Sequence, residues 1–261
     1  MIFCKRNLIC HSIILLEFWV VPLEEALPAT GKYKLQFSFN GILTGRLSGL
    51  YKSTYKRDNE TIGLVATQFQ SISARKCFPS FDEPSFRPTF HLTVIHDSNT
   101  TAISNMPELE TTLLETSNSL SQNEVTLKTT KFKETVNMVS YLLALVVSDF
   151  QCKKKTFTIS GEEKWFRVCS SPDKTYKLNY TLEIGIGIMK FFADEYFKVP
   201  YPLPKQDQIS IPDFAGNKQF LCDNLYTRHL FAFYFSVNIL REISLRRNFF
   251  VHNQVRLLLR P

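Results

Sequence analysis

Three prolines within ten residues, Pro79, Pro84 and Pro88, constrain this chain more than any other feature of its sequence. Each proline fixes its own φ angle and removes a backbone donor, so residues 78–87 can form neither an α-helix nor an inner strand of a sheet. Four phenylalanines are interleaved with them: Phe78, Phe81, Phe86 and Phe90. We therefore expect a rigid connector whose four rings pack against a core.

Short alternating segments on both sides of this connector predict β-strands. Residues 89–96 alternate and are rich in β-branched side chains, and a turn is expected at 97–99. Residues 138–150 are almost continuously apolar, which is typical of a strand buried on both faces. Further strands are expected at 33–39, 48–55, 63–70, 123–132 and 163–170, the second and third joined by the polar hairpin KRDNET. The spacing predicts a mainly β, sandwich-like or saddle-like domain over residues 20–170.

The pattern changes at Ser171-Pro172-Asp173. Apolar residues then recur with a period near 3.6, which predicts an amphipathic helix over 174–197, weakened by Gly185 and Gly187. The residues expected on its buried face are Tyr176, Leu178, Leu182, Ile186, Met189, Phe192 and Tyr196. Pro200, Pro202 and Pro204 forbid any continuation.

Four segments carry a family resemblance: TQFQ (67–70), ARKCFPSFDEPSFRPTF (74–90), AISNMP (102–107) and YPLPKQDQISIPDF (201–214). Together they resemble the aminopeptidase N-like zinc aminopeptidases, which are gluzincin metallopeptidases. The resemblance implies a divergent N-terminus at 1–16, the family's saddle-like N-terminal β domain at 17–171, and the first helix of a truncated thermolysin-like α/β catalytic domain at 172–216. Residues 217–261 are expected to be an unrelated basic and apolar tail.

The family removes N-terminal amino acids from peptides with a catalytic zinc ion. Gln68 and Gln70 match its TQ-x-Q segment, which contacts the substrate's amino end, and residues two apart on a strand share a face. No His-x-x-x-His occurs among His11, His91, His96, His229 and His252, so we expect no catalytic residue, no metal ligand and no cofactor in this chain. Asp82-Glu83 is expected to have a turn or capping role.

The resemblance therefore implies a truncated, catalytically inactive zinc aminopeptidase. Two alternatives stay open. One is a non-catalytic module that binds peptides or docks onto a full-length aminopeptidase, and the other is a poorly folded product of an incomplete gene model. Because the catalytic domain covers this β domain in the family, the helix at 174–197 and the strand at 138–150 are expected to expose apolar surface and to drive association.

The distribution of charge along the sequence argues against nucleic-acid binding. The net charge of +7 comes from Lys5, Arg6 and the residues after 216, so nucleic-acid binding by the folded part is unsupported.

Cys152 and Cys169 fall on neighbouring predicted strands and either pair or remain two buried thiols. Sequons at Asn59, Asn99 and Asn179 are possible glycosylation sites. Family members are membrane-anchored or secreted, but the apolar run at residues 8–21 is interrupted and makes neither a clear signal peptide nor a membrane span.

Overall fold

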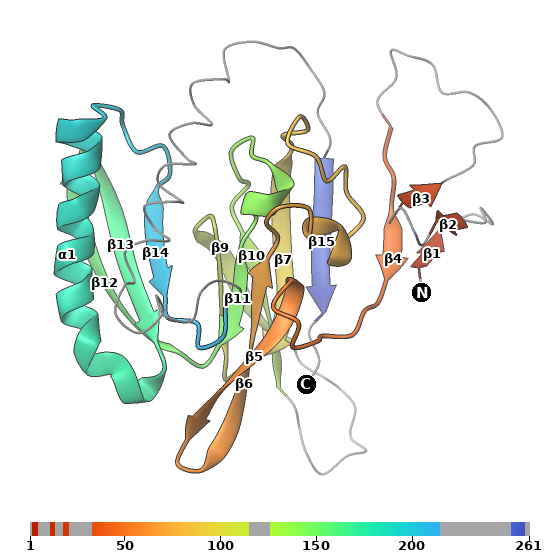
Figure 1. The fold of residues 1–261 in the computed structure, drawn as a ribbon, viewed down its shortest axis with the longest axis horizontal. Helices are drawn as coiled ribbons and strands as arrows, with labels where there is room; N and C mark the ends of the chain where they lie inside the picture. The colour runs from red at the N-terminus through yellow and green to blue at the C-terminus, as the bar shows by residue number, and fades with distance from the viewer. Residues whose placement is uncertain are drawn as a thin grey trace.

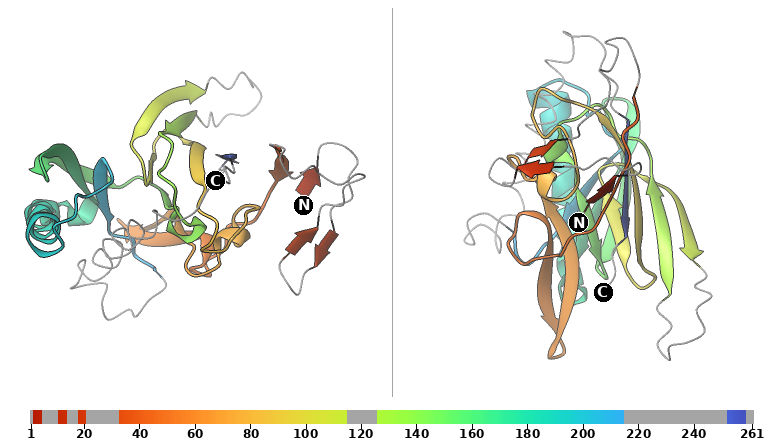
Figure 2. Two further views of the ribbon diagram at one scale, coloured as in Figure 1. Left: turned by 90° about the horizontal axis from the view of Figure 1, so that it is seen from above. Right: turned by 90° about the vertical axis from the view of Figure 1, so that its right-hand side faces the viewer.

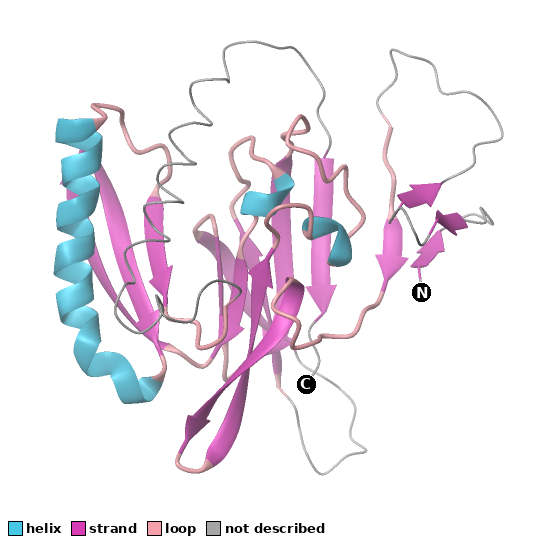
Figure 3. Ribbon diagram, viewed as in Figure 1, coloured by secondary structure: helices cyan, strands magenta, loops and turns pink. Residues whose placement is uncertain are grey.

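The computed structural model describes residues 33–114 and 126–214 with their side chains. It also gives the backbone of four short strands: β1 (Ile2–Cys4), β2 (His11–Ile13), β3 (Phe18–Val20) and β15 (His252–Leu258). The described chain consists mainly of antiparallel sheets, with one long helical segment at one end (Figures 1 and 3). The prediction of a mainly β fold followed by a helix is confirmed.

The first four-stranded sheet has the order β5-β6-β11-β8 and is antiparallel throughout. Its strands are β5 (Gly49–Arg57), β6 (Glu60–Gln68), β8 (Thr101–Ser104) and β11 (Leu145–Ser148). Asp58 and Asn59 form the predicted β5–β6 hairpin turn with φ angles of 49° and 68°. Asparagine and aspartate tolerate this left-handed conformation better than other non-glycine residues, which explains why they stand at the turn.

The second four-stranded sheet has the order β15-β7-β10-β9 (Figure 1). Its strands β7 (Thr89–Asp97), β9 (Glu108–Leu114) and β10 (Leu127–Phe132) pair antiparallel, whereas β15 lies parallel to β7. Phe90, Leu92 and Val94 of β7 pack in one buried cluster with Leu145 and Val147 of β11. The two sheets therefore share a core, as the sandwich prediction requires.

The third sheet and the helix form a separate layer, on the left in Figure 1. Strands β12 (Gln151–Ile159) and β13 (Glu162–Ser170) are antiparallel, and β14 (Lys205–Ile209) is parallel to β13. A 3₁₀ turn (Pro172–Lys177), the helix α1 (Leu178–Lys190) and a π-helical turn (Phe191–Tyr196) connect β13 to β14. This crossover packs α1 on the sheet, and its large buried apolar side chains are Leu178, Leu182, Ile186 and Met189, as predicted.

Several predicted details are wrong. The strand expected at 33–39 reduces to β4 (Phe37–Phe39), and Tyr33 and Leu35 are exposed. The strand expected at 138–150 reduces to β11, preceded by a 3₁₀ turn (Ser140–Leu142). Since β11 is buried throughout, it does not present the apolar surface expected of it. Tyr176 and Tyr196 are exposed. Tyr176 lies two residues before the buried Leu178, and residues two apart point to opposite sides of a helical segment, whereas the π turn moves Tyr196 off the buried face.

The proline-rich connector is irregular from Phe78 to Pro88, as predicted. Phe78 and Phe90 are buried and lie edge to face, with ring centroids 6.2 Å apart. Phe81 and Phe86 are 57% and 40% exposed and pack on each other at 5.2 Å. Only two of the four rings therefore enter the core, while the other two cover the outside of the loop.

Candidate functional site

The candidate site lies at the end of β6, where Gln68 and Gln70 flank Phe69. Gln68 is the last residue of β6 and pairs with Gly49 of β5. Phe69 is 3% exposed and contacts Phe78 at 5.9 Å, whereas Gln68 is half-buried and Gln70 is exposed. Phe69 therefore anchors the segment in the core between the two glutamines, and Gln70 lies beyond the end of β6. Within the described residues, no hydrogen bond engages either glutamine side chain.

The Asp82 carboxylate holds in place the proline-rich loop that follows Gln70 in the sequence. Its carboxylate accepts hydrogen bonds from the Arg75 backbone N (3.0 Å) and Nε (3.3 Å), and from Ser140 Oγ. The Arg75 guanidinium also donates to the Asp82 carbonyl oxygen at 3.0 Å. Asp82 is 5% exposed, and the neighbouring Glu83 is exposed. Asp82 is therefore a buried anchor of the proline-rich loop, and the two carboxylates do not converge on one site.

The segment Pro212-Asp213-Phe214 lies against β5, the strand paired with β6. Tyr51 is fully buried, and its hydroxyl donates to the Asp213 carbonyl oxygen at 2.9 Å. The Asp213 backbone N donates to Ser53 Oγ at 3.3 Å. The same sheet therefore carries Gln68 and contacts the segment that ends at Phe214.

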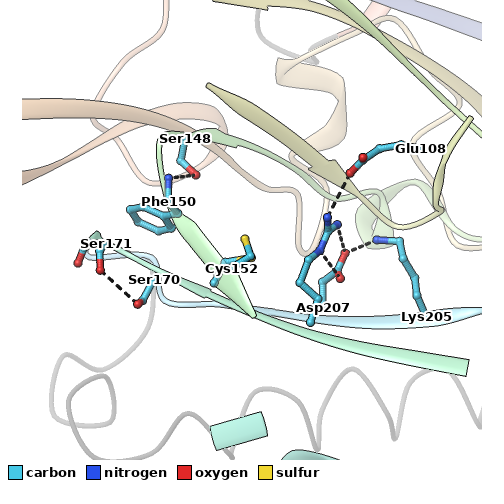
Figure 4. The surroundings of a disulfide bond; sticks show 10 residues. Glu108, Ser148, Phe150, Cys152, Ser170, Ser171, Lys205 and Asp207 are labelled. Atoms are coloured by element: carbon cyan, nitrogen blue, oxygen red, sulfur yellow. Dashed lines mark hydrogen bonds and ion pairs between the residues drawn. A yellow bond between two sulfur atoms is a disulfide. The ribbon is translucent and has the colours of Figure 1, made fainter. Parts of the chain in front are cut away.

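A charged cluster, buried except for Glu108, joins β9 to β13 and β14 (Figure 4). The Arg167 guanidinium donates two hydrogen bonds of 2.9 Å to the Asp207 carboxylate and one of 3.2 Å to Glu108. Lys205 Nζ donates to Asp207 and, at 2.6 Å, to the Ser104 carbonyl oxygen. Burial lowers the pKa of Lys205, and the Asp207 carboxylate opposes that shift. Since the donors and acceptors satisfy one another, the cluster is a structural clamp between the sandwich and the helix-bearing layer.

This charged cluster is absent from the sequence predictions. The only local signal is the Lys-x-Asp spacing of residues 205 and 207, which puts both side chains on one face of a strand. The partner Arg167 comes from β13, forty residues earlier, and only the parallel register that places Arg167 opposite Asp207 brings it there.

The described residues do not fit a catalytic zinc ion. No group of three metal-ligating side chains converges within residues 33–114 and 126–214. His96 is 1% exposed and is enclosed by Thr100 Oγ1 at 2.8 Å and Thr130 Oγ1 at 3.0 Å. His91 Nε2 lies 3.3 Å from Glu134 Oε1. His11, His229 and His252 lie outside the residues whose side chains are described.

Cys152 and Cys169 are directly opposite each other on β12 and β13 and form a disulfide bond, with Cα atoms 4.1 Å apart. The sequence had left this pairing open.

All three sequon asparagines are exposed. Asn59 stands at the tip of the β5–β6 hairpin, Asn99 in the turn after β7, and Asn179 on α1, where its Oδ1 accepts from Lys153 Nζ at 2.8 Å. Their glycosylation stays a prediction.

Comparison with known proteins agrees with this architecture. Residues 16–142 match the model of the peptidase M1 N-terminal domain. Residues 16–142 thus carry the N-terminal domain of the M1 aminopeptidase family.

Among curated proteins, the chain is 38% identical over 200 residues to aminopeptidase M1-A of Oryza sativa subsp. japonica, a match that covers 77% of this chain and 21% of the relative. It is 37% identical over 204 residues to aminopeptidase N of Bos taurus (77% and 20%), and 37% identical over 196 residues to endoplasmic reticulum aminopeptidase 1 of Homo sapiens (75% and 19%). The chain spans about a fifth of the length of these relatives.

Proposed function

We propose that this chain serves as the N-terminal domain of an M1 aminopeptidase, in which Gln68 and Gln70 contact the amino end of a peptide. The observation that supports the proposal is the pair of glutamine side chains, one half-buried and one exposed, which flank the buried Phe69 and are not engaged by other described residues. An amide oxygen is an acceptor for an ammonium group, and hydrogen bonds to charged groups contribute about 1.5–3 kcal/mol each. Two such bonds total about 3–6 kcal/mol, and the cost of association offsets most of this, so we expect an affinity no tighter than about 1 mM.

A titration followed by NMR tests this role. Leucine amide has a free amino group, and N-acetyl-leucine amide is the matched ligand without one. We expect leucine amide to shift the side-chain NH₂ resonances of Gln68 and Gln70, and the acetylated ligand to leave them unchanged. The double variant Gln68→Ala/Gln70→Ala is expected to lose the response, whereas Gln36→Ala, at an exposed glutamine before β4, keeps it. Equal shifts with both ligands, or none with either, would contradict the proposed contact.

The proposal assigns no hydrolysis to these 261 residues. A catalytic zinc ion requires three converging protein ligands and an open position for water. The sequence contains no His-x-x-x-His, and the segment that follows Phe214, AGNKQFLCDN, contains no glutamate that could bind a substrate amine. Orientation of the amine alone activates no water, so binding at Gln68 and Gln70 gives no chemical step by itself. We also assign residues 172–216 to the opening of the thermolysin-like catalytic domain.

A secretory location is part of the same proposal. The disulfide bond and the three exposed sequons suit an oxidising compartment in which glycans are added. Within the described residues, no helix has the length and apolar character needed to cross a membrane. Digestion of the protein from its native source with a glycosidase tests the location: a fall in mass is expected, and an unchanged mass would contradict it.

A further inference from the structure

The strand β7 lies between β10 on one edge and β15 on the other. On the β10 side, the Phe90 backbone N donates to Thr135 Oγ1 at 2.9 Å, and the Thr135 backbone N donates to the Phe90 carbonyl oxygen at 3.1 Å. The backbone N of Ser98, directly after β7, donates to the Thr126 carbonyl oxygen at 2.9 Å. Because successive residues of a strand direct their backbone groups to opposite edges, the even-numbered residues of β7 bond toward β10.

The other edge of β7 is therefore formed by the backbone groups of His91, Thr93 and Ile95. Strand β15 lies along this edge, parallel to β7 (Figures 1 and 2), and its register runs from His252 beside Thr89 to Leu258 beside Ile95. A row of backbone N–H and C=O groups on a sheet edge is a template for an extended chain. In this protein the chain that takes up the template is its own distant segment.

The register of β15 on β7 matches apolar with apolar and polar with polar residues. The apolar pairs are Val255 beside Leu92, Leu257 beside Val94, and Leu258 beside Ile95, and all three partners on β7 are buried. The polar pairs are His252 beside Thr89, Gln254 beside His91, and Arg256 beside Thr93, and these three partners are half-buried. Asn253 beside Phe90 is the exception. A slip of one residue would set Val255 beside a polar residue of β7, so the pattern specifies this register.

We propose that the free edge of β7 is a binding site for one extended peptide strand that runs parallel to β7, and that residues 252–258 of the same chain occupy it. The backbone groups of the edge bind the backbone of the strand, and the alternation of buried and half-buried residues on β7 selects its side chains. Because the segment is tethered to the domain, its pairing is intramolecular and competes strongly with free peptides. This inference does not depend on the proposed contact with peptide amines.

Amide hydrogen exchange of the full chain tests the pairing. The slanted bonds of a parallel pair join Thr93 to the residues on either side of its register partner Arg256, so Val255→Pro removes a donor to β7. We expect exchange at the amides of His91, Thr93 and Ile95 to become at least tenfold faster, with β11 unchanged. Asn238→Pro, elsewhere in the tail, is the matched control and should change none of these amides. Unchanged exchange in Val255→Pro would overturn the proposal.

A disulfide cross-link tests the register and the origin of the strand, and it decides the case if Val255→Pro also speeds exchange in β11. Thr93→Cys/Arg256→Cys should form a bond between residues 93 and 256 within one chain on oxidation, as found by peptide mapping. Thr93→Cys/Val255→Cys is the matched control, because residues 255 and 256 alternate between the two faces of the sheet, and it should form none. Absence of the 93–256 bond, or its formation between two chains, would overturn the intramolecular arrangement.

A peptide added in trans tests whether the edge is a binding site in its own right. A synthetic peptide of residues 250–260, added to the full-length Val255→Pro variant, should restore slow exchange at His91, Thr93 and Ile95. The same peptide carrying Val255→Pro should not restore it. Failure of the unmodified peptide to slow exchange at millimolar concentration, or an equal effect of both peptides, would contradict the proposed site.

Discussion

Gly185 and Gly187 lie on opposite sides of α1, and alanine at the two positions is expected to have opposite effects on stability. A Cβ atom added at Gly185 would lie 2.5 Å from Cζ and 2.9 Å from Cε1 of Phe166, whereas one at Gly187 would meet nothing within 4 Å. Phe166 is fully buried in the cluster between the helix and its sheet, so its ring cannot swing into solvent. Gly185→Ala must therefore shift the helix or the ring.

The expected changes in the free energy of unfolding follow from two opposing effects. Alanine is favoured over glycine inside a helix by about 1 kcal/mol, and this gain applies at both positions. Overpacking of a dense core costs about 1–3 kcal/mol, and it applies only at Gly185. Gly187→Ala should raise the free energy of unfolding by up to about 1 kcal/mol. The difference between the unfolding free energies of the two variants reports the overpacking alone. It should be about 1–3 kcal/mol, with Gly185→Ala the less stable.

Urea unfolding of dilute protein, followed by far-ultraviolet circular dichroism, measures both variants against the wild type. The dependence of the unfolding free energy on urea concentration should be unchanged, so that shifts in midpoint report stability alone. Equal stability of the two variants, or a more stable Gly185→Ala, would refute the close approach of α1 to Phe166 on which this reasoning rests.

Three further predictions concern the cysteines and a buried histidine. Replacing both Cys152 and Cys169 with serine should lower the free energy of unfolding by roughly 3 kcal/mol, the stabilisation typical of a disulfide that closes a loop of this size; an unchanged urea midpoint would contradict it. Burial raises the pKa of the Cys77 thiol to about 12, so peptide mapping should find Cys77 unalkylated by iodoacetamide at pH 8 in the folded protein and alkylated in urea. Burial and the nearby Lys128 lower the pKa of His96 below its usual 6.5, so the native state favours the neutral ring. The stabilisation that the neutral His96 ring gives the folded protein should therefore be lost as the pH falls from 6.5 through that lowered pKa. His96→Gln should flatten the stability profile below pH 6.5, and a profile identical to that of the wild type would count against this account of His96.

Secondary structure could be predicted from the sequence where the residues of a segment themselves determine its backbone conformation. The three prolines excluded regular structure between residues 78 and 87, and the alternation of β-branched residues predicted β7. Alternation failed at Tyr33 and Leu35, which the structure leaves exposed. Whether an alternating segment becomes a strand depends on the partner available to it, and the sequence does not show that partner.

Contacts between distant residues account for most of what the sequence did not reveal. Gly185 was interpreted as a weak point of the helix, yet α1 approaches Phe166 of β13 there so closely that a Cβ atom would lie 2.5 Å from the ring. The pairing of Arg167 with Asp207 depends on the parallel register of β13 and β14. The candidate site itself rested on a family resemblance at Gln68 and Gln70, and the structure adds the burial of Phe69 between them.

The most direct test of the central claim is a measurement of zinc content together with peptidase activity on the purified 261-residue protein. After dialysis against zinc-containing and then metal-free buffer, the metal content is determined by mass spectrometry, and the release of a fluorophore from leucine and alanine amides is followed with and without a chelator. A full-length M1 aminopeptidase serves as the positive control. The account predicts zinc well below one equivalent and no chelator-sensitive release. Zinc near one equivalent together with chelator-sensitive hydrolysis would contradict it.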